Sequence, residues 1–285
     1  MKGLVSVNWI KTQILEYVQT QQYTLGNEEV EPLWDTPIVG FSSGADSLYQ
    51  FYKEDIGDFY LTPNEIMTHH TNSPSIKAEN VTVISWVLPH TEENKAGMRD
   101  QTHFPTRRWV LAKNFGEQVN NQLREHLAQA LNQEGINAIA PLNSPLCQKA
   151  TSDKYGRIRT WSERHAAYTS GLGTFGLSDG LITPEGQAIR TGSIIAHIKL
   201  PTSPRPYNDH HQNCLYFTKG ICGKCIERCP IGAITRKGHD KELCRKYIDM
   251  IRKYVEKHYG LKGYACGFCQ TRVPCESKIP TTDLE

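Results

Sequence analysis

Long apolar runs and a strong charge of either sign are both missing from the sequence. The longest apolar stretches, VTVISWVLP and SIIAHIKLP, have about half the length of a membrane-spanning helix. The N-terminal stretch MKGLVSVNWIKTQ lacks the apolar core of a signal peptide. The formal net charge is only +2 over 285 residues, which gives no global indication of nucleic-acid binding. These absences predict a cytoplasmic protein that does not enter a membrane and has no nucleic-acid partner.

The charge is nevertheless unevenly distributed. Between Arg236 and Lys278, 11 Lys and Arg stand against 5 Asp and Glu, which gives a local net charge of +6. A solvated basic face is one interpretation of this segment. A docking surface for an acidic partner protein is the other.

Hydrophobic periodicity predicts helices and buried strands in alternation. Three apolar residues of WIKTQILEYVQ recur at helical spacing. Apolar residues also recur every four positions through 109–133, which predicts a long helix that ends near Gly135. Buried strands are expected at 81–89 and in the stretches INAIAP and GSIIAHIKL. This interleaving is typical of an α/β or α+β domain.

The stretch PTSPRPYNDHHQN has the composition of a linker. We place a domain boundary there, so that residues 1–205 form a core and residues 206–285 form a second unit. Within the second unit, a helix is predicted at 241–258 and Gly260 follows its end.

The stretch GLGTFG has the G-x-G-x-x-G spacing of a dinucleotide-binding loop, with Gly171, Gly173 and Gly176 at the glycine positions. Its surroundings are wrong for that function. A helix is predicted before it, in WSERHAAYTS, and turn signals follow it in LSDGLITPEG, whereas a dinucleotide site needs a strand before the loop and a helix after it. We therefore do not expect a nicotinamide cofactor, and a tight structural turn stays open as an interpretation.

Nine cysteines are unusual for a cytoplasmic protein unless they bind something, because disulfides are rare in that compartment. Cys147 stands apart and is expected to be a buried, inert thiol. The other eight lie between residues 214 and 275. Their first half resembles the ferredoxin run C-x2-C-x2-C-x3-C-P, except that Lys219 occupies the first cysteine position and Cys214 is expected to replace it through a longer loop.

In that ferredoxin run, three thiolates hold one 4Fe-4S cluster and the fourth crosses to the other cluster. This rule predicts two clusters with four ligands each. The first cluster is assigned Cys214, Cys222, Cys225 and Cys275. The second cluster is assigned Cys229, Cys244, Cys266 and Cys269.

Other uses of these cysteines explain the spacing less well. A zinc ribbon needs 15 to 20 residues between its two C-x2-C pairs, whereas here about 40 residues separate them and four cysteines would be left over. The C-x3-C-x2-C triplet of a radical S-adenosylmethionine enzyme does not occur in the sequence.

The stretch SERHAAYTSGLGTFGLSDGLIT, followed by a two-cluster unit, resembles the catalytic cores of epoxyqueuosine reductases and cobalamin-dependent reductive dehalogenases. The resemblance implies an α+β fold, in which a nitroreductase-like, cobalamin-binding-type α/β core precedes a ferredoxin-like module with two 4Fe-4S clusters. It also implies that the core holds a base-off cobalamin and that a ferredoxin or flavodoxin is the acidic electron donor. The cofactor-binding residues it implies are Arg164, Gly171, Leu172, Gly173 and Gly176.

The chain departs from these relatives in two places. We expect the chain to lack the helical repeat domain that follows the clusters in epoxyqueuosine reductases, and Arg157 stands where those enzymes have an acidic proton donor. Tyr155 is the alternative proton donor, as a phenol is in the dehalogenases, although an ordinary surface turn also explains SDKYGR.

Three functional hypotheses follow. The first is a cobalamin-dependent iron-sulfur reductase that acts on a substrate which the sequence does not identify. The second is an electron-transfer protein without a corrinoid. The third is a tRNA-modifying enzyme like epoxyqueuosine reductase, against which the balanced charge argues.

Overall fold

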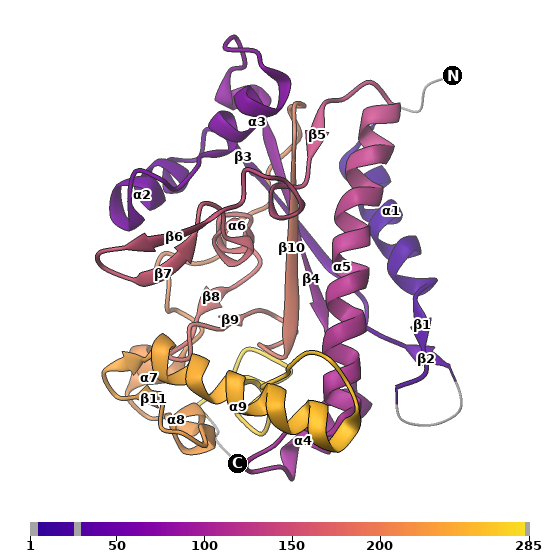
Figure 1. Ribbon diagram of the computed structural model, residues 1–285. Helices are drawn as coiled ribbons and strands as arrows, with labels where there is room; N and C mark the ends of the chain where they lie inside the picture. Colours follow the sequence, from indigo (N-terminus) through magenta and orange to yellow (C-terminus); the bar gives the residue numbers. More distant parts are fainter. Residues whose placement is uncertain (1–4, 26–29, 283–285) are drawn as a thin grey trace.

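The computed structural model describes residues 5–25 and 30–282 (Figure 1). A four-stranded antiparallel sheet lies at its centre, in the order β3-β4-β10-β5. The strands span Ile38–Ser43 (β3), Thr82–Pro89 (β4), Ile189–Ala196 (β10) and Ala138–Ile139 (β5). Helices cover both faces of this sheet, so the core has three layers (Figure 1). The expected mixed helix-and-sheet class is confirmed.

The central strand β4 is buried along its whole length, as its continuous apolar run predicts. Its side chains alternate between the two faces. Ile84, Trp86 and Leu88 enter one hydrophobic core, whereas Val83 and Val87 enter the other. One strand therefore supplies both cores of the domain.

The first face of the sheet is covered by α1 (Val7–Gln19) and α5 (Arg107–Gln133). The predicted helix 109–133 is confirmed, and it begins two residues earlier because the Thr106 side chain accepts a hydrogen bond from the Trp109 backbone N–H. At its other end, Gly135 has a φ of +81°, the left-handed conformation that the sequence predicted there.

The opposite face is covered by α2 (Ser47–Ile56), α3 (Pro63–Thr71) and α6 (Glu163–Thr169). Aromatic rings fill much of this core. Trp161 lies parallel to Tyr49, with ring centroids 6.0 Å apart, and Tyr52 packs edge-on against Tyr60. The helix expected in WSERHAAYTS is confirmed as α6.

Two of the predicted strands differ in length from expectation. The strand in INAIAP has only two residues, because Pro141 starts a 3-10 turn (η2, Pro141–Asn143) and the Asn132 side chain bonds both backbone groups of Ala138. The strand in GSIIAHIKL begins earlier, at Ile189, because β10 pairs with β4 over eight residues.

The stretch expected to be a linker is instead fixed against β3, the edge strand of the sheet. The Ser203 backbone N–H donates to the carbonyl oxygen of Phe41, and the Ser203 hydroxyl accepts from the Phe41 N–H. We call residues 201–207 the strap. It leads from β10 to the cysteine-rich residues that follow.

Small elements complete the chain. In the core these are β1 (Gln22–Tyr23), β2 (Glu31–Pro32), η1 (Ala78–Asn80), α4 (Glu92–Arg99), the hairpin β6–β7 (Lys149–Ser152 and Gly156–Arg159) and the hairpin β8–β9 (Thr174–Phe175 and Leu181–Ile182). After the strap come α7 (Leu215–Lys219), α8 (Lys224–Arg228), β11 (Ile234–Thr235), β12 (Gly238–His239), α9 (Lys241–Tyr259) and η3 (Phe268–Gln270). The helix predicted at 241–258 is confirmed as α9, and Gly260 follows it with a φ of +63°. Among the described residues, no helix combines the length and the apolar character needed to cross a membrane.

Gly192 on β10 leaves room for the indole of Trp86, since a Cβ at this position would overlap that ring. We expect Gly192→Ala to lower the free energy of unfolding by about 1–3 kcal/mol through overpacking, measured by urea denaturation. The control is Gly97→Ala in the exposed part of α4, where the new methyl group meets only ordinary contacts and should add about 0.5–1 kcal/mol. Equal stability of the two variants would contradict the tight packing of Trp86.

Candidate functional site

Four thiols come together around α7 and α8. Burial, together with the neighbouring thiols of Cys214 and Cys222, raises the pKa of the Cys225 thiol to about 12. Burial and these same three thiols also raise the pKa of Cys275. These mutual effects define a first group, which consists of Cys214, Cys222, Cys225 and Cys275.

A second group forms where α9 meets η3. Burial, together with the thiols of Cys244 and Cys229, raises the pKa of the Cys266 thiol to about 12. The pKa of Cys269 is also raised by burial and then by these neighbours together with Cys225, so the two groups lie side by side. Across residues 5–25 and 30–282, no three His, Cys, Asp or Glu side chains are placed to bind one common metal ion.

Local structure explains which group each cysteine joins. Cys222 and Cys225 lie on either side of Gly223, where α8 begins, whereas Cys229 lies at the other end of this one-turn helix. Because α8 separates its two ends, Cys229 faces the second group. Cys214 caps α7, whose five residues form the longer loop expected from the sequence.

Nitrogen donors from the protein reach the sulfur atoms of both groups. The Ala233 backbone N–H donates to Cys229 Sγ over 3.2 Å. The Gln187 side-chain amide donates to Cys275 Sγ over 3.1 Å and to the Cys269 carbonyl oxygen over 2.7 Å. Gln187 could not be predicted from the sequence, because a single glutamine outside the cysteine-rich segment belongs to no motif that marks a cluster site.

Gly171 and Gly173 lie between α6 and β8, and Gly176 lies in the turn between β8 and β9, so a helix precedes the loop and a strand follows its second glycine, the reverse of a dinucleotide-binding arrangement. Gly171 has a φ of +80°, and a Cβ there would overlap the carbonyl oxygen of Pro204. A Cβ on Gly173 would overlap the carbonyl oxygen of Ile182, whereas one on Gly176 would meet the Ile182 side chain at 3.1 Å. These contacts account for the first two glycines by packing within the chain, and a cofactor role of the loop stays a prediction.

The neighbouring predicted residues also make contacts within the protein. Leu172 is buried in the core of the second face. The Arg164 guanidinium donates to the carbonyl oxygen of Asp179. Glu163 accepts from Arg124 over 3.2 Å, and this ion pair is almost completely buried. Glu163 thus connects α6 with α5, and Arg164 connects α6 with the β8–β9 turn.

Tyr155 lies in the β6–β7 turn, beside a small cavity of about 290 Å3. Its hydroxyl donates to Asp55 over 2.6 Å, and Lys154 donates to the other oxygen of the same carboxylate. The lining residues are Tyr155, Gly156, Arg157, Asp179, His239, Asp240, Lys241 and Glu242. Tyr155 therefore lies where it would contact a ligand bound in this cavity, and its catalytic role stays a prediction.

His239 connects this cavity to the second thiol group. Its ring lies 3.1 Å from the Asp179 carboxylate. The pKa of His239 is raised to about 9, most strongly by a hydrogen bond to Asp179 and less strongly by one to Cys244. The cavity is thus one side chain away from Cys244.

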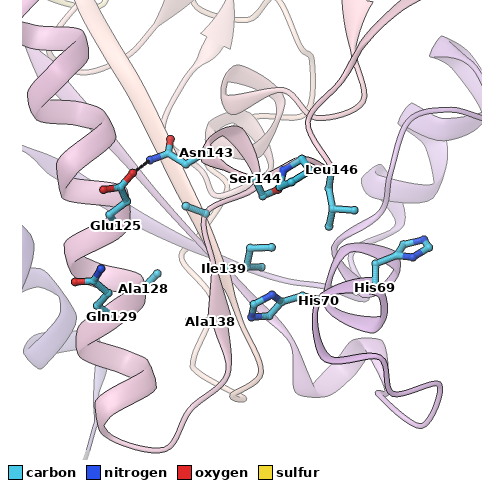
Figure 2. Close-up of a pocket in the computed structure, with 12 residues that line it drawn as sticks. His69, His70, Glu125, Ala128, Gln129, Ala138, Ile139, Asn143, Ser144 and Leu146 are labelled. Carbon is cyan, nitrogen blue, oxygen red and sulfur yellow. Dashed lines mark hydrogen bonds between the residues drawn. The ribbon is translucent and has the colours of Figure 1, made fainter.

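A second, larger cavity of about 540 Å3 lies at the opposite end of the sheet, between α3 and α5 (Figure 2). Ala138 and Ile139 form part of its apolar lining, and His69 and His70 stand at the end of α3. None of the predicted site residues lines it. Cys147, expected to be buried, is half-buried, and burial raises the pKa of its thiol.

One arginine makes several of the bonds that hold the cysteine-rich residues to the core. Arg228, at the end of α8, donates to the carbonyl oxygens of Met98, Gln101 and Thr271 over 2.8–3.2 Å. Its guanidinium also lies over the Phe268 ring. These bonds tie α8 to the end of α4 and to the segment that carries the second group.

Two curated relatives match part of the chain in sequence. Epoxyqueuosine reductases of Bacillus anthracis and Bacillus cereus are each 30% identical to it over 119 residues. These residues are 40% of this chain and 29% of each relative, so the match spans less than a third of the relatives' length. No protein-family model matches the chain.

Solved reductive dehalogenases share the fold. A catabolic reductive dehalogenase in complex with 3-bromo-4-hydroxybenzoic acid is 15% identical, with a TM-score of 0.54 over 95% of this chain and 37% of its own. A reductive dehalogenase described for B12-dependent dehalogenation has a TM-score of 0.51 at the same identity and coverage. At this identity, the similarity concerns the fold alone. The predicted resemblance to both groups of proteins is confirmed.

One further neighbour is an epoxyqueuosine reductase solved with an epoxyqueuosine-modified tRNA stem loop. It is 19% identical, with a TM-score of 0.48 over 95% of this chain and 66% of its own. That protein binds RNA, and the expectation that this chain has no nucleic-acid partner stays a prediction.

We expect Arg228→Gln to lower the free energy of unfolding by about 1–3 kcal/mol, because it leaves buried carbonyl oxygens without a donor. Urea denaturation of the anaerobically prepared protein measures this. Lys224→Gln, four residues away in the same helix, removes only an exposed pair with Glu227 and should change stability by less than about 0.5 kcal/mol. If the two variants are equally stable, Arg228 does not anchor α8.

Proposed function

We propose that the chain is an iron-sulfur oxidoreductase. It holds two 4Fe-4S clusters in residues 206–285 and carries out reductive chemistry in the core formed by residues 1–205. The observation that supports this proposal is the arrangement of eight thiols in two adjacent groups of four. Each group has the ligand number of one cubane cluster. The relatives in sequence are reductases, which agrees with an enzymatic function.

The surroundings of the thiols suit such clusters. The ligands lie among apolar side chains, including Leu177, Ile182 and Ile234, and they receive N–H donors from Ala233 and Gln187. Hydrogen bonds to sulfur and exclusion of water set the potential of an iron-sulfur cluster. In a cubane each thiolate binds its own iron atom, so four neighbouring thiols supply the number of ligands that one cluster needs.

A base-off cobalamin is the finer part of the proposal. When bound, such a cofactor supplies the reductive chemistry at cobalt, while the protein orients it and excludes water. The resemblance of the stretch SERHAAYTSGLGTFGLSDGLIT to these families and the fold shared with reductive dehalogenases support it. Tyr155, whose hydroxyl is oriented by Asp55, is the residue that we propose as proton donor.

Electron transfer without a corrinoid is the second candidate function. It is favoured by the packing of Gly171 and Gly173, which is explained by contacts within the chain. Reduction of epoxyqueuosine in tRNA is the third, supported by the names of the sequence relatives alone.

Cobalamin binding separates the first two candidates. We expect the anaerobically reconstituted protein to retain cob(II)alamin through gel filtration and to give it the electron paramagnetic resonance spectrum of the base-off form. Elution of all the cobalamin apart from the protein, with its spectrum unchanged, would leave electron transfer as the function.

Crossed ligation makes a second prediction, because the two clusters can be told apart by their reduction potentials. Cys229→Ser should alter the same cluster as Cys266→Ser, and Cys275→Ser should alter the same cluster as Cys222→Ser, since each group borrows one thiolate from the other half of the sequence. Anaerobic potentiometric titration followed by electron paramagnetic resonance measures this.

The control for these variants is Cys147→Ser, which lies outside both groups and should leave both clusters with about eight iron atoms in all. If Cys229→Ser instead alters the cluster of Cys222 and Cys225, ligation is local and the assignment is wrong.

A further inference from the structure

The loop between two ligands of the first group is unusually exposed. Residues 217–221 are all exposed, although Cys214 before them is buried. Two large apolar side chains stand in this run, Phe217 with 45% and Ile221 with 49% of their surface accessible. Large apolar side chains gathered at one exposed place indicate a surface that contacts another molecule.

Stacked rings make this surface rigid. The Phe217 ring lies parallel to the His211 ring, with centroids 3.8 Å apart, and His211 contacts His210 at 4.0 Å. A hydrogen bond between His211 Nδ1 and the Phe175 carbonyl oxygen fixes the middle ring. A binding surface that is already ordered loses less conformational entropy on association.

The surface carries positive charge. Residues 210–226 contain no Asp or Glu and two lysines, of which Lys224 pairs with Glu227, so Lys219 supplies the charge of the loop itself. The Tyr216 hydroxyl donates to the Arg236 carbonyl oxygen, which brings the exposed Arg236 and Lys237 close to α7. A basic rim around apolar side chains attracts an acidic protein and speeds its association.

We propose that the surface formed by His210, Phe217, Lys219 and Ile221 docks an acidic one-electron carrier protein, which reduces the cluster of the first group. This inference rests on the proposed function. With a flavodoxin as carrier, the anionic flavin hydroquinone would give up one electron and become the neutral semiquinone, and a cluster held by the first group would accept that electron. The basic rim complements the acidic surface of such a carrier.

The exposed side of α9 is the competing surface, and it is less suited. Its apolar side chain Met250 lies six residues from Cys244, which corresponds to about 9 Å along a helix axis. Ile221, in contrast, is the direct neighbour of Cys222 in the chain. A carrier on the α7 loop therefore comes nearer to a ligand.

The test uses stopped-flow reduction of the reconstituted protein by a reduced acidic flavodoxin, with dithionite as a small reductant for comparison. We expect the double variant Phe217→Ser/Ile221→Ser and the variant Lys219→Glu to lower the second-order rate with flavodoxin about tenfold or more. The rate with dithionite should not change. The matched controls Met250→Ser and Lys253→Glu on α9 should stay within about twofold of the unmodified protein.

Unchanged flavodoxin rates in the α7-loop variants would overturn the docking site. Loss of a labelled single-stranded RNA by these variants, with unchanged flavodoxin rates, would identify the stacked rings as a nucleic-acid platform instead.

Cross-linking tests docking without any redox reaction. A zero-length carbodiimide reagent should join Lys219 to a flavodoxin carboxylate, and Lys219→Gln should lose this product while Lys253→Gln keeps it. If dithionite fails to reduce the protein, the proposed function is wrong, and the cross-link still decides the docking site: no product at Lys219 overturns it.

Discussion

The pairing of β4 with β10 positions the residues that hold the segment around Cys275. The ladder of eight residue pairs ends at Ile189 and Pro89, at the ends of the two strands nearest the cysteines. Just before β10, the backbone N–H of Gln187 donates to the Cys275 carbonyl oxygen, and that of Ala188 donates to Glu276. A shift of register by one residue would move these donors and reverse the faces of β10, so both cores oppose it.

The end of β4 secures the same segment from the other side. It leads into α4, where Arg99 pairs with Glu276 and Lys95 donates to the Ser277 hydroxyl over 2.8 Å. The segment around Cys275 is therefore held by residues that follow β4 and residues that precede β10. Cys275, the residue that we propose crosses between the halves of the cysteine-rich sequence, is thus placed by the central sheet of the core.

Regular patterns of hydrophobic spacing were predictable from the sequence, whereas single contacts between residues far apart in the chain were not. The helices α5 and α9 and the strand β4 followed from hydrophobic spacing, because burial of one face or of both faces leaves a regular pattern. The length of strand β5 was overestimated. The Asn132 side chain bonds Ala138 from the neighbouring helix α5, and this contact between two elements is not visible in the sequence pattern.

The contacts of the candidate site show the same limit. The partner of Gly171 is Pro204, and the bond from Gln187 reaches Cys275, 88 positions along the chain. Glycine spacing alone gives no indication of which backbone comes close. Glu163 is a further example, because its burial against Arg124 is a property of the folded core.

The strap across β3 has a consequence for the behaviour of the protein at high concentration. An uncovered edge strand offers free N–H and C=O groups to which a second copy can add its own strand. Ser203 occupies both backbone groups of Phe41, and Pro201, Pro204 and Pro206 in the strap have no amide hydrogen to donate. The segment that joins the core to its cysteine-rich partner thus also guards the sheet against edge-to-edge aggregation.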